Sequence, residues 1–414
     1  MLKINKLLIA VCIFVGAVTT VSAQNSTNSP YTRFGYGQLA DRSFGAGRSM
    51  GGVGYGLRSS RQINPMNPAS YSVMDSMTFL FDAGASFQMS WFNDGTNRSS
   101  DINGNFEYVA LQFPLSRRIA ISAGLMPYSH VGYTFSAISS DGPGSLTQFS
   151  GTGGLNDVFV GASIDIWKKR LAVGANIAYM FGKVDHRRSI TTTNTMYTMN
   201  KTEAHSLGFD IGLQYTHPLT KTERLTFGAV YSPARELKTT RYDLISNDEY
   251  FLSSMIQADT ATNEGFGTPD TYGFGVTFTK DYKLIVAADV SYQTWQGTKI
   301  PGTDNAKDRL KVAVGGEYIP NNFTRLYMNR VRYRAGLHYS NSYFNVNGSG
   351  YDELGVSLGA GFPMLDNRSF INASFEYVKI VPAKTNVGLI NEQYFRFTLS
   401  YTFNEFWFMK RKID

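Results

Sequence analysis

The sequence predicts an all-β fold: a transmembrane antiparallel β-barrel of about 14 strands, with an irregular N-terminal plug inside the lumen. The first observation behind this prediction is composition. The chain of 414 residues is 14% aromatic, contains 40 glycines and is only 17% charged. Strands that alternate lipid-facing and lumen-facing side chains are rich in aromatic residues, yet they contain no long apolar run.

The second observation is a period of two in the apolar residues. From Met77 to Trp91 every second residue is apolar, which predicts a strand with one apolar face. The same pattern over 158–166 and 171–181, joined by the turn WKKR, predicts a long antiparallel hairpin. Similar runs begin near Phe106, Ile119, Ser206, Leu225, Tyr272, Leu284, Leu310, Arg330, Gly355, Ser369 and Phe395.

The third observation is that short and long connections alternate, as they do at the two ends of an outer-membrane barrel. The short turns are 114–117, 167–170, 218–223, 280–283 and 365–368, and 320–329 is the one long member of this set. The long polar loops are 93–105, 139–154, 187–202 and 239–267. Trp91, Trp167, Trp295 and Trp407 all fall at predicted strand ends, which predicts two aromatic girdles.

The first 23 residues have the features of a secretory signal peptide. Lys3 and Lys6 precede an apolar run, and Val21-Ser22-Ala23 gives an A-x-A-like cleavage site. We expect residues 24–75 to form the plug, 76–404 the barrel and 405–414 a periplasmic tail. Because Cys12, the only cysteine, lies in the leader, we expect no disulfide in the mature chain.

No catalytic, metal-binding or cofactor motif stands out in the sequence. The five histidines are isolated, and neither an HExxH motif nor a GxSxG elbow is present. The formal net charge of +7 falls to +5 without Lys3 and Lys6, and no basic stripe suggests nucleic-acid binding. We therefore expect a protein that is not an enzyme and that takes no metal, no cofactor and no nucleic acid.

The stretch RQINPMNPASYS, residues 61–72, is hostile to strand formation. Proline lacks a backbone N–H and forces the preceding residue into extended conformations, so Asn64-Pro65 and Asn67-Pro68 impose irregular backbone. Such backbone is tolerated at membrane depth only inside protein or beside a water-filled cavity. We therefore expect this region to lie within the barrel. The alternative is that the Asn-Pro pair forms only a turn into the first strand.

These residues also carry a resemblance to a known family. AGRSMGGVGYGLRSSRQINPMNPASYS resembles the N-terminal hatch of the FadL-type long-chain fatty-acid transporters, with Asn67, Pro68 and Ala69 matching its Asn-Pro-Ala motif. Residues 225–238 and 268–296 are also similar to that family. The resemblance implies a fourteen-stranded barrel closed by a hatch, which moves hydrophobic molecules and releases them sideways at the third strand.

The third predicted strand, IAISAGLMPYSHVGYTFS, has Pro127 in its middle. A proline inside a sheet removes a hydrogen bond from the ladder and belongs at an edge or a bulge. Pro127 therefore predicts a defect in the wall, and the resemblance implies that this defect is a lateral opening.

Arg330, Arg332 and Arg334 alternate with uncharged residues, so we expect all three to face the lumen from one strand. One interpretation is a basic ladder that holds an anionic head group. The other is a network in which the arginines pair with lumenal acids such as Glu317 on the preceding strand, or with hatch carbonyls, because polar barrel interiors routinely carry such charges.

The chain continues past a clean last strand, YFRFTLSYTF, with the tail NEFWFMKRKID. Aromatic residues in the tail precede basic ones: Phe406, Trp407, Phe408, Lys410, Arg411 and Lys412. One interpretation is an anchor at the membrane interface, with the aromatic rings at its edge and the basic groups beyond. The other is a docking peptide for a partner in the periplasm.

Two functions are consistent with these features. The first is a FadL-like channel in the outer membrane of a Gram-negative bacterium, which takes up hydrophobic or amphipathic small molecules and releases them laterally beside Pro127. The second is a non-catalytic barrel subunit of a larger outer-membrane complex for protein secretion or outer-membrane protein assembly. Expected partners are outer-membrane lipid, a hydrophobic small-molecule ligand, and envelope proteins bound through periplasmic turns and the C-terminal tail.

Overall fold

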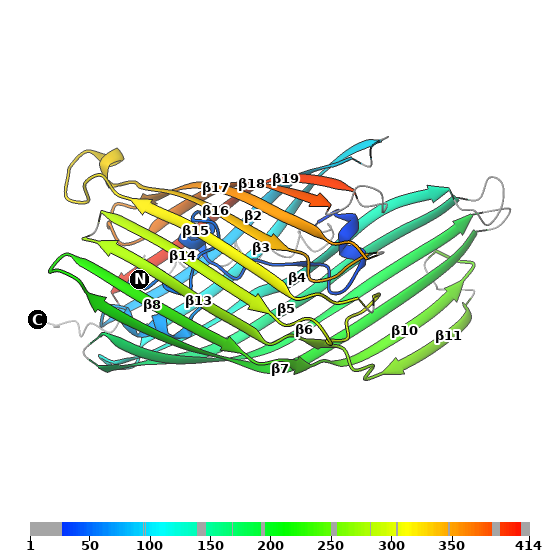
Figure 1. Cartoon of the computed structure of the whole chain (residues 1–414), viewed down its shortest axis with the longest axis horizontal. Helices are drawn as coiled ribbons and strands as arrows, with labels where there is room; N and C mark the ends of the chain where they lie inside the picture. The colour runs from blue at the N-terminus through cyan, green and yellow to red at the C-terminus, as the bar shows by residue number, and fades with distance from the viewer. Residues whose placement is uncertain are drawn as a thin grey trace, which may run out of the picture.

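Fourteen antiparallel strands form a closed barrel, which confirms the predicted fold class (Figure 1). The last strand, β19 (Asn391–Phe406), pairs with the first, β2 (Thr78–Asn93), and so closes the ring. The other wall strands are β3 (Arg98–Pro114), β4 (Ile119–Ile138), β5 (Leu146–Trp167), β6 (Leu171–Thr191), β7 (Thr195–Pro218), β8 (Glu223–Ser232), β13 (Thr271–Lys280), β14 (Leu284–Gln293), β15 (Arg309–Tyr318), β16 (Arg332–Asn341), β17 (Tyr351–Pro363) and β18 (Phe370–Pro382). The computed structural model describes residues 27–93, 95, 97–138, 146–167, 169–191, 195–249, 255–281, 283–303, 305–346, 348–382 and 390–406. The predicted signal peptide lies outside the described residues.

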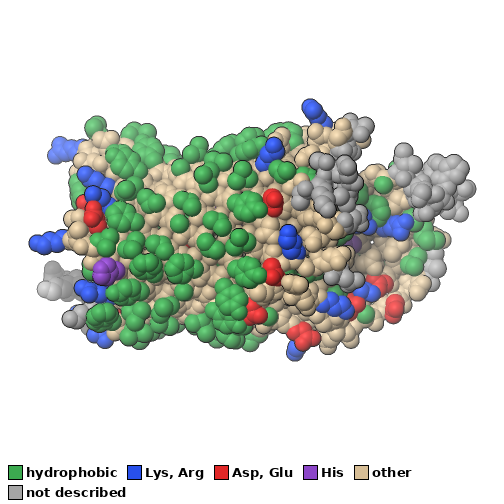
Figure 2. All heavy atoms as spheres, in the orientation of Figure 1, with side chains coloured by type: hydrophobic (Ala, Val, Ile, Leu, Met, Phe, Trp, Pro, Cys, Tyr) green, Lys and Arg blue, Asp and Glu red, His purple; other side chains and the backbone are tan. Residues whose placement is uncertain are grey.

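Side chains alternate between the two faces of the wall. In β16, Tyr333, Leu337 and Tyr339 point outward and are exposed, whereas Arg334 and His338 point inward and are buried. Figure 2 shows hydrophobic side chains over a broad band of the visible face, with charged side chains at one rim and beyond the band at the other end. An apolar outer band around a polar interior suits a barrel that sits in a bilayer.

The long-loop end of the barrel carries more strand than the sequence predicted. Hydrogen bonding in β5, β6 and β7 continues through much of the predicted loops 139–154 and 187–202. Two further strands, β10 (Lys238–Ser246) and β11 (Met255–Thr262), extend this sheet, because the upper part of β7 pairs with β10 (Figure 1). These segments were predicted as loops because they lack an apolar face. Beyond the bilayer both faces of a strand contact water, so no alternation marks it.

The described helices are short: η1 (Pro30–Arg33), α2 (Gly45–Arg48), η2 (Pro68–Val73) and η3 (Tyr327–Arg330). None of them is long and apolar enough to cross a membrane.

Residues 27–75 lie inside the barrel, with η1, α2, η2 and the two-residue strand β1 (Gln38–Leu39) joined by irregular backbone (Figure 1). This segment, called the hatch below, packs its backbone directly on glycines of the wall. A Cβ atom on Gly228 of β8 would lie 1.8 Å from the carbonyl oxygen of Tyr55, and one on Gly336 of β16 would lie 2.1 Å from the carbonyl carbon of Met50. Any larger side chain at these wall positions would displace the hatch.

We expect Gly228→Ala to loosen the hatch without opening the barrel, because the new methyl group would overlap the Tyr55 carbonyl. Overpacking of this kind typically costs about 1–3 kcal/mol. Limited proteolysis of the folded protein in detergent should therefore cleave the hatch faster in this variant than in the wild type. The matched control is Gly104→Ala in β3, where the nearest atom to a new Cβ is a Phe87 ring carbon at 3.7 Å. Equal hatch cleavage in both variants would contradict the close packing.

Candidate functional site

The hydrogen-bonded wall is interrupted between β3 and β4. These strands pair only from Pro114 to Val109, where Val109 faces Leu125. Beyond that point β3 stays paired with β2 as far as Arg98, and β4 stays paired with β5 as far as Ile138. The long-loop half of the barrel therefore has a gap between β3 and β4, which we call the seam.

Irregularities flank the seam on both sides. The β2–β3 register shifts between Gly84 and Ala85, and the β4–β5 register shifts between Pro127 and Ser129. Bulges bend a strand and increase its twist. The structure places Pro127 two positions beyond Leu125, the last β4 residue that pairs with β3. The wall defect expected from Pro127 thus coincides with the seam.

The hatch fills the edge of β4 that β3 leaves open. Gln38 and Leu39 of β1 pair antiparallel with His130 and Ser129, and the Ala40 N–H donates to the Tyr128 carbonyl at 2.9 Å. Further along the same edge, the hydroxyl of Thr32 donates to the Gly132 carbonyl at 3.0 Å and accepts from the Gly132 N–H at 3.2 Å. The hatch therefore substitutes for part of a wall strand at the seam.

The Asn-Pro-Ala motif ties the hatch to β6 and β7 of the wall. The Asn67 side-chain oxygen accepts from the Ala69 N–H at 3.1 Å and so caps η2. The Asn67 amide nitrogen donates to the carbonyls of Tyr55 at 2.9 Å and of Leu213 on β7 at 3.1 Å. Pro68 lies against Gly174, where a Cβ atom would come within 2.5 Å of the proline carbonyl. Asn67 and Ala69 are fully buried.

Two of the three predicted lumenal arginines pair with the predicted acid. The Arg334 Nε donates to Glu317 at 2.7 Å, and an Arg332 terminal nitrogen donates to the other Glu317 oxygen at 3.1 Å. Arg334 also donates to the Asn372 side-chain oxygen at 2.7 Å. Arg332 and Arg334 therefore form an ion-pair network with a lumenal acid, and they do not form a free basic ladder.

Arg330 does not belong to this group, so its predicted place on the strand is wrong. It is the last residue of η3, and β16 begins two residues later at Arg332. The Arg330 guanidinium donates to Asn367 in the neighbouring short turn at 2.6 Å. The alternation of residues 330–334 was read as one strand, but η3 occupies its first position.

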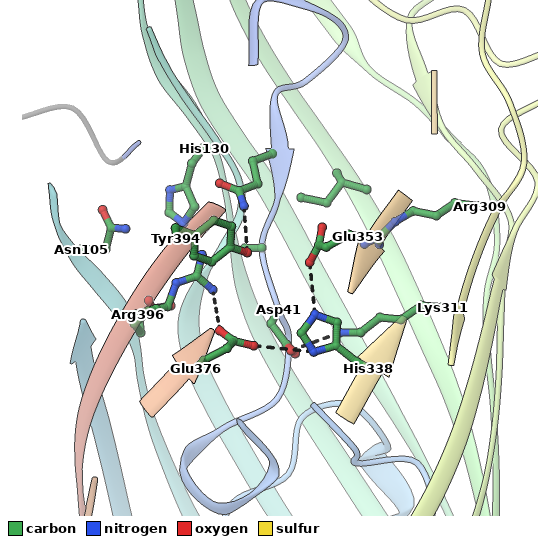
Figure 3. A pocket seen from close by; sticks show the side chains of 14 residues that line it. Asp41, Asn105, His130, Arg309, Lys311, His338, Glu353, Glu376, Tyr394 and Arg396 are labelled. Carbon is green, nitrogen blue, oxygen red and sulfur yellow. Dashed lines mark hydrogen bonds and ion pairs between the residues drawn. The ribbon is translucent and has the colours of Figure 1, made fainter. Parts of the chain in front are cut away.

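A polar cavity lies behind the seam and carries charged groups from many elements (Figure 3). Asn105 and Glu107 of β3 and His130 of β4 line it on the seam side, next to β1 of the hatch. No local sequence motif marks these residues. Charged residues at inward positions of the strands were the available signal, but strand alternation does not say which of them meet across a lumen.

The charged groups around the cavity form ion pairs. Asp41 of the hatch accepts from Lys311 at 3.1 Å, and His338 lies 3.2 Å from Glu353 (Figure 3). Burial opposes the charged form of Asp41, but Lys311 and Arg48 outweigh it and hold the pKa of this carboxyl well below its usual value. The hatch is therefore fastened to β15 by a partly buried ion pair.

Aromatic side chains fill the lumen on the long-loop side of this cavity. The Trp295 ring centroid lies 4.7 Å from that of Tyr343 and 6.2 Å from that of Tyr36 in the hatch. Tyr343 donates its hydroxyl to the Gly37 carbonyl at 2.7 Å. The predicted place of Trp295 in an outer aromatic girdle is therefore wrong: it is fully buried against the hatch.

Only the start of the C-terminal tail belongs to the described chain. Phe406 is exposed, and the Arg368 guanidinium lies 3.5 Å from its ring centroid. Trp407, Phe408, Lys410, Arg411 and Lys412 lie outside the described residues.

We expect Glu317→Gln to destabilise the barrel, because it leaves the buried guanidinium groups of Arg332 and Arg334 without a carboxylate. Removing one partner of a buried pair typically costs about 3–5 kcal/mol. The free energy of unfolding in urea and detergent would measure the loss. Glu223→Gln, which breaks the exposed pair with Lys280, is the control and should change little. Equal stability of the two variants would refute a stabilising role for the Glu317 cluster.

Solved structures with the same barrel include hydrocarbon transporters. The Ralstonia pickettii toluene transporter TbuX has a TM-score of 0.62 and 16% identity, over 87% of this chain and 98% of that chain. The P. putida toluene transporter TodX has a TM-score of 0.63 and 14% identity, over 89% and 100%. A Pseudomonas aeruginosa FadL homologue has a TM-score of 0.56 and 13% identity, over 89% and 99%. These likenesses show that the fold is the FadL-type barrel.

No curated protein matches the sequence. The family model described as BamG matches residues 1–414. The chain therefore belongs to the BamG family.

Proposed function

We propose that the protein is a FadL-like channel of the outer membrane that takes up hydrophobic or amphipathic small molecules and releases them laterally at the seam. The observation that carries this proposal is the early end of β3–β4 pairing at Val109 and Leu125, in a wall whose ring is otherwise closed. Lipid-facing side chains surround the barrel, so a molecule that left through the seam would enter the bilayer. The toluene transporters TbuX and TodX share the fold and support the same class of activity.

The cavity behind the seam narrows the proposal toward amphipathic molecules. Glu107, Lys311 and Glu353 line the cavity, and burying a hydrocarbon against charged groups would displace their water without replacing its hydrogen bonds. The guanidinium of Arg309 donates to Ser340 at 3.1 Å, and it has no ion pair with a carboxylate in the described chain. A polar head group in the cavity and an apolar chain toward the seam would suit both surroundings.

The decisive experiment locks the hatch to β4. Leu39 and Ser129 are paired residues of an antiparallel ladder, where Cα atoms lie about 4.5–5.5 Å apart, within the range that a disulfide bridges. We expect Leu39→Cys/Ser129→Cys to form a disulfide in the periplasm. Uptake of radiolabelled oleate by cells that produce the oxidised variant should fall to the level of cells without the protein, and reductant should restore it.

The control for this lock is Thr271→Cys/Gln293→Cys, which joins two wall strands that are already fully paired, β13 and β14. This variant should take up oleate at the wild-type rate in both redox states. Wild-type uptake by the oxidised Leu39→Cys/Ser129→Cys variant would refute lateral passage at the seam. Parallel measurements with toluene test whether a polar head group is required.

A second function is favoured by the filled lumen: a non-catalytic barrel subunit of a larger outer-membrane complex, for protein secretion or outer-membrane protein assembly. The long-loop side of the lumen is filled by the packed rings of Trp295, Tyr343 and Tyr36. Elsewhere in the lumen the hatch backbone packs directly on glycines of the wall. A barrel that works as a scaffold needs no open path through its lumen.

The scaffold role predicts that tagged protein, extracted from its own membrane in mild detergent, migrates as a stoichiometric assembly on native gels. A channel that works alone predicts a particle of the size of one barrel and its detergent. Native mass spectrometry of the purified particle distinguishes the two. A lone barrel that retains a bound amphipathic molecule would count against the scaffold role.

A further inference from the structure

The turn between β15 and β16 presents apolar side chains to solvent on the short-turn side of the barrel. Phe323 is 84% exposed, Leu326 67% and Met328 60%. This turn extends beyond the strand ends, as the yellow segment in Figure 1 shows. The length of this turn is not needed to connect two neighbouring strands, because the other short turns of the barrel connect their strands with far fewer residues.

Hydrogen bonds hold the turn in one shape. The Asn321 N–H donates to the Asn329 carbonyl at 2.8 Å, and the Phe323 N–H donates to the Asn321 side chain at 3.0 Å. The Tyr333 hydroxyl donates to the Met328 carbonyl at 3.1 Å, which fixes the turn to the start of β16. The apolar side chains are therefore displayed from an ordered backbone.

This turn also forms hydrogen bonds with the turn between β17 and β18. The Tyr327 hydroxyl donates to the Pro363 carbonyl at 3.1 Å, and Arg330 donates to Asn367 at 2.6 Å. Leu365 of this neighbouring turn is fully exposed. The two turns together form one surface, here called the platform, made of Phe323, Leu326, Met328, Leu365, Arg325, Arg330 and Arg368.

The charge of the platform is positive. The neighbouring acid Asp366 is occupied by its own turn: it accepts from the Arg368 N–H at 3.0 Å and from the Ser369 hydroxyl at 2.7 Å. Partial burial raises the pKa of Asp366, but these hydrogen bonds outweigh it and lower the pKa overall. Asp366 therefore does not neutralise the arginines of the platform by direct pairing.

We propose that the platform is the docking site for a periplasmic protein whose surface offers an apolar pocket bordered by aspartate and glutamate side chains. This proposal rests on the scaffold role described above. The apolar side chains would fill the pocket, and the arginines would meet the carboxylates at its border. Burying aromatic and methionine side chains with arginines around them is typical of the energetically dominant part of protein interfaces.

Charge and composition favour this occupant over three others. A second copy would bring the same positive surface, and the C-terminal tail would bring Lys410, Arg411 and Lys412, so both would be repelled. Lipid remains as a competitor, because basic and apolar groups together also suit a membrane surface. The basic residues of the platform are arginines and none is a lysine. Its two turns are also joined by a hydrogen bond, and binding to a fluid lipid surface does not require such a fixed arrangement.

The experiment compares four full-length forms extracted in mild detergent. The apolar variant is Phe323→Ser/Leu326→Ser/Leu365→Ser, and the charge variant is Arg325→Glu/Arg368→Glu. The control is Leu115→Ser/Leu219→Ser, which removes exposed leucines from two other short turns. Heat-modifiable gel mobility verifies that each barrel is folded, and native mass spectrometry measures the assembly. A photo-cross-linking amino acid at position 323 in otherwise wild-type protein identifies what touches the platform.

We expect the wild type and the control to retain the assembly, and both platform variants to lose it by about tenfold or more, the effect of removing one dominant interface contact. The cross-link should fall on an apolar segment of another protein flanked by acidic residues. Assembly that persists in both platform variants would overturn the platform proposal and leave the scaffold role standing. A wild type that runs as a lone barrel, with its cross-link on phospholipid, would overturn both. A cross-link to a second copy of this chain would also overturn the proposal.

Discussion

The pairing of backbone N–H and C=O groups at membrane depth is the constraint on which this structure depends. Hydrocarbon offers no hydrogen bonds, so a sheet that crosses a bilayer must close on itself, and any break in the ring must be covered. The ring closes where β19 meets β2, over sixteen residue pairs from Asn391 to Phe406. It fails between β3 and β4, and there the hatch strand β1 supplies part of the missing partner. The irregular N-terminal segment thus completes part of the wall and also fills the lumen.

The hatch can serve in this way because it is held by matched polar contacts. Asp289 on β14 accepts from the backbone N–H groups of Gly54 and Tyr55, at 2.6 and 2.8 Å. The side-chain amide of Asn67 donates both to the Tyr55 carbonyl in the hatch and to the Leu213 carbonyl in the wall. Where the hatch backbone forms neither a strand nor a helix, side chains of the wall supply its hydrogen-bond partners. Wall glycines then allow the hatch backbone to come close enough for these bonds.

The sequence predicted what alternation along one strand can determine, and it failed where distant strands meet. Period two correctly placed Arg332 and Arg334 in the lumen opposite Glu317, because strand neighbours follow from the order of the chain. Arg330 was misplaced, since one turn of 3-10 helix preserves the apparent alternation. Trp295 was assigned to a girdle because strand ends favour that position, but its partners Tyr36 and Tyr343 are far away in the sequence. Pro127 predicted a defect, yet nothing local predicted that Gln38 and Leu39 would cover it.

The fold leaves the function open, because the properties that would select a cargo lie in the lumen and at the turns. The seam is a property of the wall and would suit any molecule that leaves toward lipid. The cavity behind it is lined by charges that a hydrocarbon could not satisfy, so an apolar cargo would gain little by passing there. A cargo with a polar head would replace water at these groups while its chain lay in the seam. Where the hatch itself pairs with a charge of the wall, as Asp41 pairs with Lys311, no cargo is needed to balance that charge. The two functions thus differ in whether the ion pairs between hatch and wall must break.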